Sequence, residues 1–166
     1  MTQATDPILL LTTGGTIDKL YFDALSEYKI GESIITRILE TARVTQPVEI
    51  REVLRKDSLD LSDADRALIA DAVADAASRR VVITHGTDTM THTAQALGDV
   101  AGKTVVLVGA LAPARFAESD ATFNLGMAFA TAQVAPPGVY ITMNGTVFRA
   151  DAVVKDRERG AFVAKA

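Results

Sequence analysis

The chain of 166 residues has no cysteine, no tryptophan and two histidines. Without cysteine it cannot form a disulfide, a thiolate nucleophile or a cysteine-based metal site. His85 and His92 lack a carboxylate or cysteine partner at the spacing of metal ligands, so we interpret both as structural polar residues. The sequence therefore predicts neither a metal site nor another cofactor.

An excess of positive charge and a long apolar run are also missing. Lysine and arginine number 17 against 21 aspartates and glutamates, which gives a formal net charge of −4 at pH 7. This balance argues against a nucleic-acid partner or an anionic membrane surface. The run ILLL at 8–11 is too short to span a bilayer, and the first residues lack the basic segment and cleavage site of a secretory signal. We therefore expect no membrane partner and a cytoplasmic location.

Apolar side chains are abundant enough to form one core. Hydrophobic residues make up 48% of the chain and charged residues 23%, a composition typical of a globular protein. A domain of roughly 150 residues buries about 70% of the surface that its unfolded chain exposes. No internal repeat, linker or low-complexity segment interrupts the sequence, so we expect residues 1–166 to form a single domain.

Four nearly continuous apolar runs are typical of strands covered on both faces, as in a parallel sheet. They lie at 7–13, 81–84, 104–110 and 139–143. Alternating polarity predicts a fifth strand at 49–53. The dipeptide NG at 144–145 follows one apolar run and precedes the segment TVFRA, which predicts a hairpin and an added antiparallel strand.

Amphipathic segments separate these predicted strands. In the segment 62–78, apolar residues recur along one helical stripe, and Ser62 with Asp65 has the spacing of a capping box. Further helices are predicted at 31–43, 89–99 and 121–134, the last ended by the prolines at 136–137. The alternation predicts a three-layer α/β fold: a mostly parallel sheet, helices on both faces, and an antiparallel hairpin near the C-terminal end.

Polar residues gather where ligand sites of such folds lie, beyond the carboxyl ends of the strands. The clusters are LTTGGTID at 11–18, DSLD at 57–60 and THGTDTM at 84–90. Gly14 and Gly15 allow a tight turn and a close approach of the backbone to a ligand. By itself TTGGT is equally typical of an ordinary turn after a strand. It is neither a dinucleotide fingerprint nor a P-loop, so a nucleotide-binding domain is a disfavoured alternative.

Five segments in order carry a resemblance to a known family. TGGTI at 13–17 and HGTDTM at 85–90 are the most specific. They are followed by SDATFNLGMAFA at 119–130, MNGTVFRA at 143–150 and VVK at 153–155. Together these segments resemble the bacterial-type L-asparaginases. The resemblance implies an enzyme that converts L-asparagine and water to L-aspartate and ammonia.

Hydrolysis of an amide needs an activated nucleophile, a proton for the leaving ammonia and donors for the developing oxyanion. The resemblance implies Thr16 as the acyl-forming nucleophile. It also implies a relay of Thr87, Asp88 and Lys155, in which Lys155 accepts the proton of Thr87; a lysine fits because cysteine is absent. How the two threonines share the nucleophilic and water-activating steps stays open. Taken singly, Asp88 also fits a helix N-cap and Lys155 a solvated surface residue.

A tyrosine from the loop after the first motif assists the first threonine in the family. Two residues of this chain fit that role. Tyr28 has the family's spacing to Gly31, whereas Tyr21 lies just after the motif in a loop that looks abbreviated. We favour Tyr21 for the catalytic role and place Tyr28 among the substrate-binding residues.

The α-carboxylate and the α-ammonium of the substrate need partners of opposite charge or polarity. The resemblance implies that Ser58 binds the α-carboxylate and that Asp88 pairs with the α-ammonium. Asp60 is a candidate for a second negative contact, although it also fits an acidic residue before a helix. Gly15 completes this set, because its lack of a side chain allows the backbone to approach the ligand.

Two departures from the family affect the prediction. Most members are longer and carry a second domain, whose acidic residue enters a neighbouring subunit's site. This chain resembles the N-terminal catalytic domain alone. Leu59 stands where longer members tend to have glutamine, and it cannot hydrogen-bond the head group. We therefore expect a raised KM, low activity on glutamine, and self-association into a homodimer or homotetramer.

Two further functions remain as alternatives. One is an amidase that acts on glutamine, a D-amide or a modified amino acid. The other is a sensor domain that binds an amino acid without turning it over. Because Thr16, Thr87, Asp88 and Lys155 are all present, a nucleophile and its base are retained, and the sequence favours the enzyme.

Overall fold

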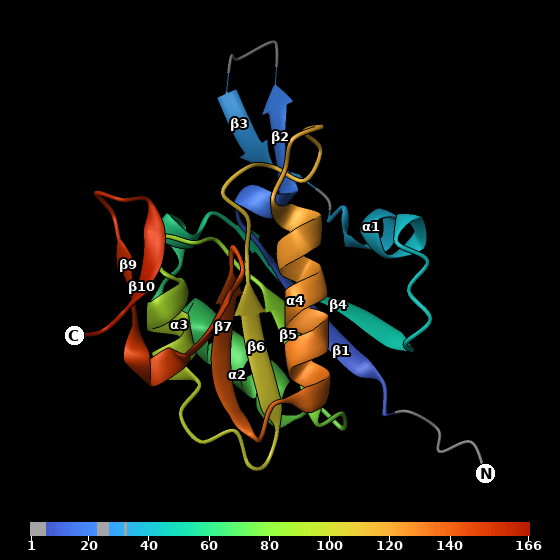
Figure 1. The fold of residues 1–166 in the computed structure, drawn as a ribbon, viewed down its shortest axis with the longest axis vertical. Coiled ribbons are helices and arrows are strands. Elements are labelled where there is room, and N and C mark those ends of the chain that lie inside the picture. Colours follow the sequence, from blue (N-terminus) through green and yellow to red (C-terminus); the bar gives the residue numbers. More distant parts are fainter. Residues whose placement is uncertain (1–5, 23–26, 32) are drawn as a thin grey trace.

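A six-stranded sheet forms the centre of the molecule (Figure 1). The computed structural model describes residues 6–22, 27–31 and 33–166; the side chains of residues 21–30 lie outside that description. The strand order is β4–β1–β5–β6–β7–β8, with parallel pairing up to β7 and an antiparallel β8. The strands are β1 (Ile8–Gly14), β4 (Val48–Lys56), β5 (Arg80–Thr84), β6 (Thr104–Val108), β7 (Gly138–Met143) and β8 (Thr146–Arg149).

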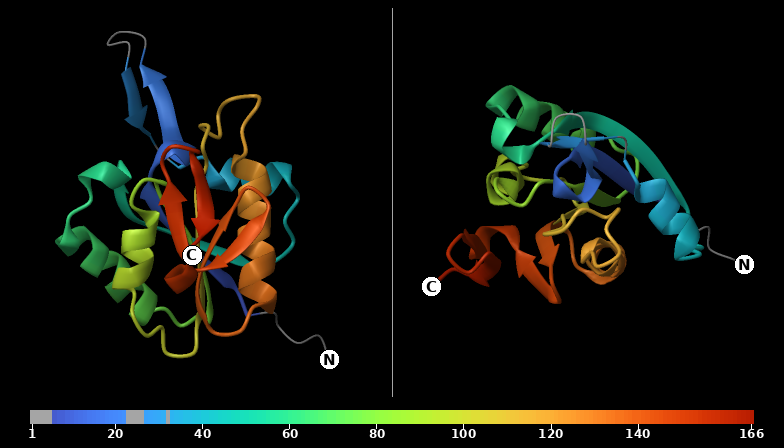
Figure 2. Two further views of the ribbon diagram at one scale, coloured as in Figure 1. Left: turned by 60° about the vertical axis from the view of Figure 1, so that its left-hand side comes forward. Right: turned by 90° about the horizontal axis from the view of Figure 1, so that it is seen from above.

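Helices cover both faces of this sheet (Figure 2). They are α1 (Ile35–Thr41), α2 (Asp63–Ala74), α3 (Met90–Ala96) and α4 (Ala121–Val134). Leu9 and Leu11 of β1 pack in the core beneath α2 and α3, whereas Ile8 and Leu10 pack in the core beneath α1 and α4. Side chains of a strand point alternately to the two faces, so one apolar run fills both cores. The predicted three-layer α/β fold is confirmed.

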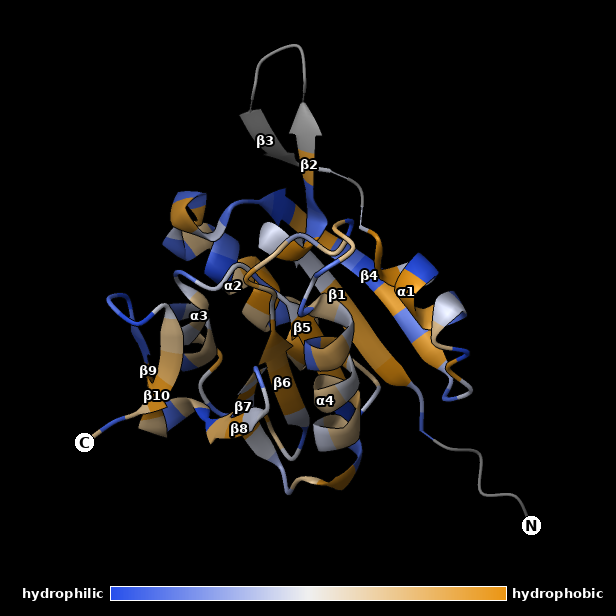
Figure 3. Cartoon of the chain, turned by 45° about the horizontal axis from the view of Figure 1, so that its top comes forward, coloured by the Kyte–Doolittle hydropathy of each residue, from blue (hydrophilic) through white to orange (hydrophobic). Residues whose placement is uncertain are grey.

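The position of each strand in the sheet follows its polarity. Every residue of β1 and β6 is buried, and much of these two strands is coloured hydrophobic in Figure 3. The edge strand β4 is mostly exposed and carries alternating charges such as Glu49 and Arg51. Charged side chains on an edge strand hinder pairing with another sheet, so this sequence suits an outer position.

The turn between β7 and β8 is the predicted hairpin. Asn144 has φ 48° and Gly145 has φ 93°, the left-handed backbone that a two-residue turn of this kind requires. The helix boundaries differ more from prediction. The segment 31–43 is helical only from Ile35, because the chain before it is held by Asp18, whose carboxylate accepts the Ile34 N–H at 2.9 Å. The predicted capping box of α2, formed by Ser62 and Asp65, is present.

Two further hairpins were not predicted. The first joins β2 (Lys19–Phe22) and β3 (Glu27–Ile30) and projects beyond the sheet in Figure 1. The second joins β9 (Val153–Asp156) and β10 (Ala161–Ala164) and lies beside α3. Within the described ranges, no helix is both long and apolar enough to cross a bilayer.

Candidate active site

The three predicted polar clusters meet at the carboxyl edge of the sheet. The first cluster forms the turn η1 (Thr16–Asp18) after β1, and the second forms η3 (Ser58–Asp60) after β4. A Cβ added to Gly15 would lie 2.4 Å from the amide nitrogen of Gly86, and one added to Gly86 would lie 2.5 Å from Ser58 Oγ. Because Gly15 also has φ 93°, the close contact of these turns depends on glycine.

Lys155 reaches this edge from β9. Its Nζ donates to Thr87 Oγ1 at 2.8 Å and to Asp88 Oδ1 at 2.6 Å. The Lys155 side chain is 14% exposed and that of Asp88 is 39% exposed, so this ion pair opens to solvent on the carboxylate side. A neutral amine at the same position would accept the hydroxyl proton of Thr87. The structure therefore brings together the three residues of the predicted relay, although 68 residues separate Lys155 from Thr87.

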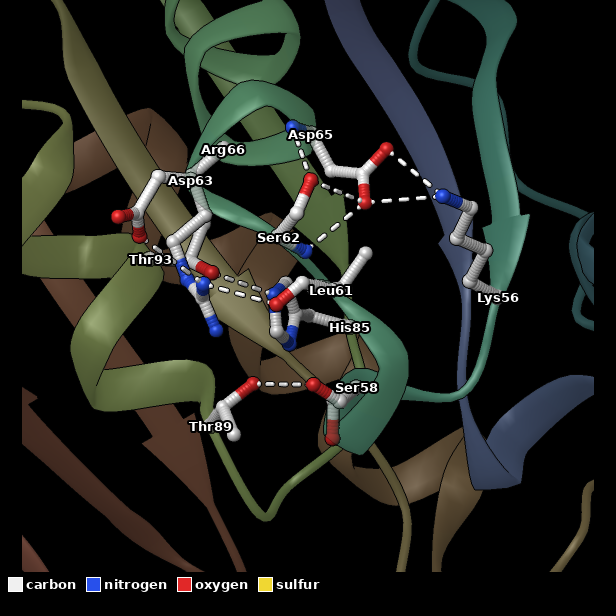
Figure 4. Close-up of polar contacts among 10 residues, drawn as sticks. All are labelled: Lys56, Ser58, Leu61, Ser62, Asp63, Asp65, Arg66, His85, Thr89 and Thr93. Carbon is white, nitrogen blue, oxygen red and sulfur yellow. Dashed lines mark hydrogen bonds and ion pairs between the residues drawn. The ribbon is translucent and has the colours of Figure 1, made fainter.

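His85 holds the turn that carries Thr87. The imidazole is fully buried, and burial lowers its pKa to about 4. Nδ1 lies 2.7 Å from Gly86 O. Nε2 lies 2.7 Å from Thr93 Oγ1, a contact drawn in Figure 4. Since a carbonyl only accepts, Nδ1 carries the proton and Nε2 accepts from the Thr93 hydroxyl. His85 thus links the turn to α3 as a neutral structural residue.

Ser58 has one of the four buried side-chain polar atoms without a hydrogen-bond partner in the described residues. The residue is 1% exposed, and within the described part of the chain its Oγ has no hydrogen-bond partner. Its backbone carbonyl is held by the Thr89 hydroxyl at 2.8 Å (Figure 4). Buried polar atoms are normally satisfied, so an unpaired hydroxyl held against Gly86 has the character expected of a ligand-binding group.

Among the described contacts, none joins the other predicted catalytic and binding residues to Lys155. Thr16 is partly buried in η1, directly after Gly15. Asp60 is exposed at the end of η3, and among the described contacts none joins it to Thr87 or Lys155. Tyr21 and Tyr28 pair backbone to backbone across the β2–β3 hairpin. Their side chains lie outside the described residues, so the choice between these two tyrosines stays a prediction.

The sequence interpretation missed several polar residues that support the site. Asp18 is 1% exposed, and burial raises the pKa of its carboxyl group even though the carboxylate accepts the Ile34 N–H. Its carbonyl accepts the Gly31 N–H at 3.0 Å, so Asp18 closes the base of the β2–β3 hairpin beside Thr16. The signal available in the sequence was the position of this acidic residue directly after TGGTI. A carboxylate that is buried needs hydrogen-bond donors from nearby residues.

A second missed group surrounds the start of α4. Asp120 accepts hydrogen bonds from the backbone of Leu111 and Ala112 and from the side chains of Asn124 and Asn144. Both Asp120 and Asn124 lie in the segment SDATFN that contributed to the family resemblance. The segment marked their positions, but only the folded chain shows their shared contacts.

Comparison with known proteins identifies the family to which this chain is similar. The family model described as asparaginase, N-terminal, matches residues 7–163. The L-asparaginase of Thermococcus kodakarensis is 32% identical over 163 residues, covering 92% of this chain and 48% of that protein. L-asparaginase 2 of Escherichia coli is 32% identical over 159 residues, covering 89% of this chain and 46% of that protein.

Structural similarity gives the same result. The solved structure of the Thermococcus kodakarensis L-asparaginase has a TM-score of 0.84 at 30% identity, covering 95% of this chain and 51% of that one.

Another relative by sequence is a glutamyl-tRNA(Gln) amidotransferase component of Pyrobaculum aerophilum, 34% identical over 139 residues, covering 79% of this chain and 33% of that protein. The chain thus spans about half the length of the curated asparaginases that it matches. With nearly all of its residues matched by the family model, the chain belongs to the asparaginase N-terminal family.

Proposed function

We propose that the protein hydrolyses the side-chain amide of L-asparagine to L-aspartate and ammonia through a threonine nucleophile. The observation that carries the proposal is the contact of Lys155 Nζ with Thr87 Oγ1 and Asp88 Oδ1. An amine and a hydroxyl in hydrogen-bond contact, with a carboxylate to orient the amine, form a proton-accepting pair of the kind that hydrolysis through a threonine ester requires. We further propose that residues 1–166 act as one catalytic domain.

The reaction proceeds in two halves. In the first, Thr16 Oγ attacks the amide carbon, the hydroxyl proton passes to the leaving nitrogen, and ammonia departs to leave an ester. In the second, a water molecule attacks the ester carbonyl while the Thr87–Lys155 pair takes its proton. That proton returns to Thr16 Oγ as aspartate leaves. No cofactor takes part in either half.

Three groups of the site bind the head group of the substrate in this proposal. The unpaired hydroxyl of Ser58 donates to the α-carboxylate. Asp88, which is 39% exposed and uses Oδ1 for Lys155, pairs with the α-ammonium, and the exposed Asp60 offers a second negative charge. Gly15 has no side chain, so in this proposal its backbone lies against the substrate, while its contact with the Gly86 backbone holds the two turns together.

Leu59 weakens this recognition. Its side chain is 64% exposed on the same turn as Ser58, where a polar residue would be able to hydrogen-bond the head group. Each missing hydrogen bond to a charged group costs about 1.5–3 kcal/mol, so the KM for asparagine is high. Glutamine is a poorer substrate because a weakly anchored head group positions a longer side chain less well.

A second candidate activity has support from the relatives. Some matched proteins carry the names glutaminase-asparaginase and glutamyl-tRNA(Gln) amidotransferase. An amidase acting on a related amide is therefore the alternative, and kcat/KM for asparagine and glutamine separates the two. Equal values for the two amides would contradict the asparagine preference.

The direct experiment measures ammonia released from L-asparagine by the wild type, Thr16→Ala and Thr87→Ala. Thr131→Ala is the matched control, because Thr131 is a buried threonine of α4 whose hydroxyl donates to Met127 O. We expect both site variants to lose turnover and the control to keep it. Unchanged turnover in both site variants would reject the mechanism, and a wild type that binds asparagine without releasing ammonia would indicate a sensor.

A further inference from the structure

Asp120, at the start of α4, binds donors from three separate segments. Its carboxylate accepts the Leu111 N–H at 3.0 Å and the Ala112 N–H at 3.1 Å, both from the loop after β6. It also accepts the side-chain amides of Asn124 and Asn144, each at 2.8 Å. Asn124 belongs to α4, and Asn144 to the turn between β7 and β8. One carboxylate thus joins the loop, the helix and the turn.

Asn124 extends this network into the core. The residue is 0% exposed; its Nδ2 also donates to Gly109 O at 3.0 Å, and its Oδ1 accepts the Asn144 N–H at 2.9 Å. The Ser119 hydroxyl donates to Ala112 O at 2.9 Å, so both backbone groups of Ala112 are held. Fixed at several points, the segment 109–114 has little freedom to move relative to α4.

The segment 109–114 contacts both threonine turns of the site. A Cβ added to Gly109 would lie 2.5 Å from His85 O and 3.2 Å from Thr87 Cγ2, so Gly109 packs directly against the second turn. Five residues later, the Ala114 N–H donates to Ile17 O at 3.1 Å, next to Thr16 in the first turn. The segment therefore spans the two turns from one side.

The charge of Asp120 strengthens these bonds. Burial acts to raise the pKa of its carboxyl group, but the hydrogen bonds from Leu111, Ala112, Asn144 and Asn124 outweigh burial and lower it. The group is therefore a carboxylate at neutral pH, and hydrogen bonds to a charged acceptor are stronger than neutral ones. These four donors are neutral N–H groups, so an amide in place of the carboxylate would present its own N–H₂ to some of them.

We infer that Asp120 is a positioning residue for the proposed hydrolysis. It fixes the segment 109–114 against the turns of Thr16 and Thr87, and so sets the relative placement of the two hydroxyls. Part of this inference rests on the proposed function, because it assigns both threonines to one reaction. The other part is purely structural: loss of the carboxylate loosens the segment 109–114 and the turn that it touches.

The test compares Asp120→Asn with two controls in the full chain. Asp99→Asn removes a carboxylate that also accepts a backbone amide, that of Ala101, in the turn before β6. Val73→Ala opens a cavity in the core under α2 and corrects for any general loss of stability. Amide hydrogen exchange and steady-state kinetics with L-asparagine are measured for each variant.

In Asp120→Asn, we expect the amides of Leu111, Ala112 and Ala114 to exchange about tenfold faster or more, while those of α2 are unchanged. We expect kcat to fall by about 10- to 100-fold with a smaller change in KM, because a misplaced nucleophile slows the chemical step. Asp99→Asn keeps both properties, and Val73→Ala raises exchange throughout the molecule without a selective loss of kcat.

Two results would overturn the inference. The first is protection in the segment 109–114 that is unaltered in Asp120→Asn. The second is a loss of kcat no larger than in Val73→Ala at an equal folded fraction. A wild type without turnover contradicts the proposed function instead, and hydrogen exchange then decides the structural part alone: local loosening supports the role of Asp120, and unchanged exchange rejects it.

Discussion

Lys155 is the residue whose surroundings define the site. It lies 2.8 Å from one hydroxyl and 2.6 Å from one carboxylate, with 14% of its side chain exposed. A surface lysine would keep its ammonium in water, whereas this one is directed inward to two polar partners. In the proposed mechanism it is the base, since the chain has no cysteine and His85 is buried and neutral.

Two replacements of Lys155 distinguish the effect of its positive charge on kcat from the effect of its basicity. Lys155→Met removes the amine, and we expect kcat to fall by about 10²- to 10⁴-fold, the usual contribution of a general base. Lys155→Arg keeps a cation beside Asp88 but cannot be deprotonated, so we expect no recovery. Lys103→Met, which removes an exposed lysine bonded to Ala74 O, is the control. Activity restored by arginine would show that positive charge alone is needed.

A second prediction at the scale of single residues concerns the glycines of the turns. Gly15→Ala places a methyl group against the Gly86 backbone at φ 93°, and we expect it to cost about 2–4 kcal/mol of unfolding free energy as well as activity. Gly126→Ala adds the same methyl group in α4, where no atom lies within 4 Å. This control is expected to gain about 1 kcal/mol. Denaturant unfolding measures both, and a Gly15→Ala variant as stable as the wild type would contradict the close contact of the turns.

At the scale of elements, His85 couples the Thr87 turn to α3, and this coupling depends on pH. The pKa of His85 is lowered from 6.5 to about 4, so between these values the unfolded chain binds a proton that the folded chain does not. The contribution of His85 to stability is therefore complete above pH 6.5 and falls as the pH decreases to 4, by about 3 kcal/mol.

The measurement is unfolding free energy at several pH values between 7 and 4 for the wild type, His85→Gln and the control His92→Gln. We expect the loss of stability on acidification to persist in the control, whose histidine is exposed. In His85→Gln we expect this loss to be removed, which leaves the opposite dependence from the raised pKa of Asp18. Carboxyl groups whose pKa is lowered, such as that of Asp65 with a pKa of about 2, lose their contribution to stability only at more acidic pH. The same pH dependence in the wild type and in His85→Gln would show that His85 is not buried as described.

Some elements were predictable from sequence and others were not, for physical reasons. Buried strands such as β1 and β6 have continuous apolar runs, and the hairpin at Asn144 has a dipeptide with its own backbone preference. The short strands of β2–β3 and β9–β10 contain mixed residues without a clear period, so no pattern marked them. Lys155 lies on β9, and its place was therefore indicated by the family resemblance and not by periodicity.

The approach of three candidate site residues was predictable from sequence, but the contacts that support them were not. Motifs identified Thr87, Asp88 and Lys155, and the structure joins them. The convergence of Asp120, Asn124 and Asn144 depends on how α4 meets two strand ends, a long-range arrangement that a local pattern does not encode. The burial of Asp18 was likewise not predictable, because it depends on contacts with Gly31 and Ile34 later in the chain.

At the scale of the whole molecule, self-association stays a prediction, and several large apolar side chains are exposed. Phe123 is 62% exposed and Val134 is 82% exposed, both on α4, and Leu59 is 64% exposed beside the site. Association of monomers would remove such side chains from water. We expect a homodimer or homotetramer in sedimentation at micromolar concentration, with activity that falls on dilution. A monomer with full activity would contradict this prediction.

The central claim is that Thr87 and Lys155 work as one unit, and a double-mutant cycle tests it most directly. Ammonia release from L-asparagine is measured for the wild type, Thr87→Ala, Lys155→Met and the double variant. Because residues that act as a unit have strongly non-additive effects, we predict that the double variant is about as slow as the slower single variant. Losses that multiply in the double variant would show that the two side chains act independently and would contradict the account.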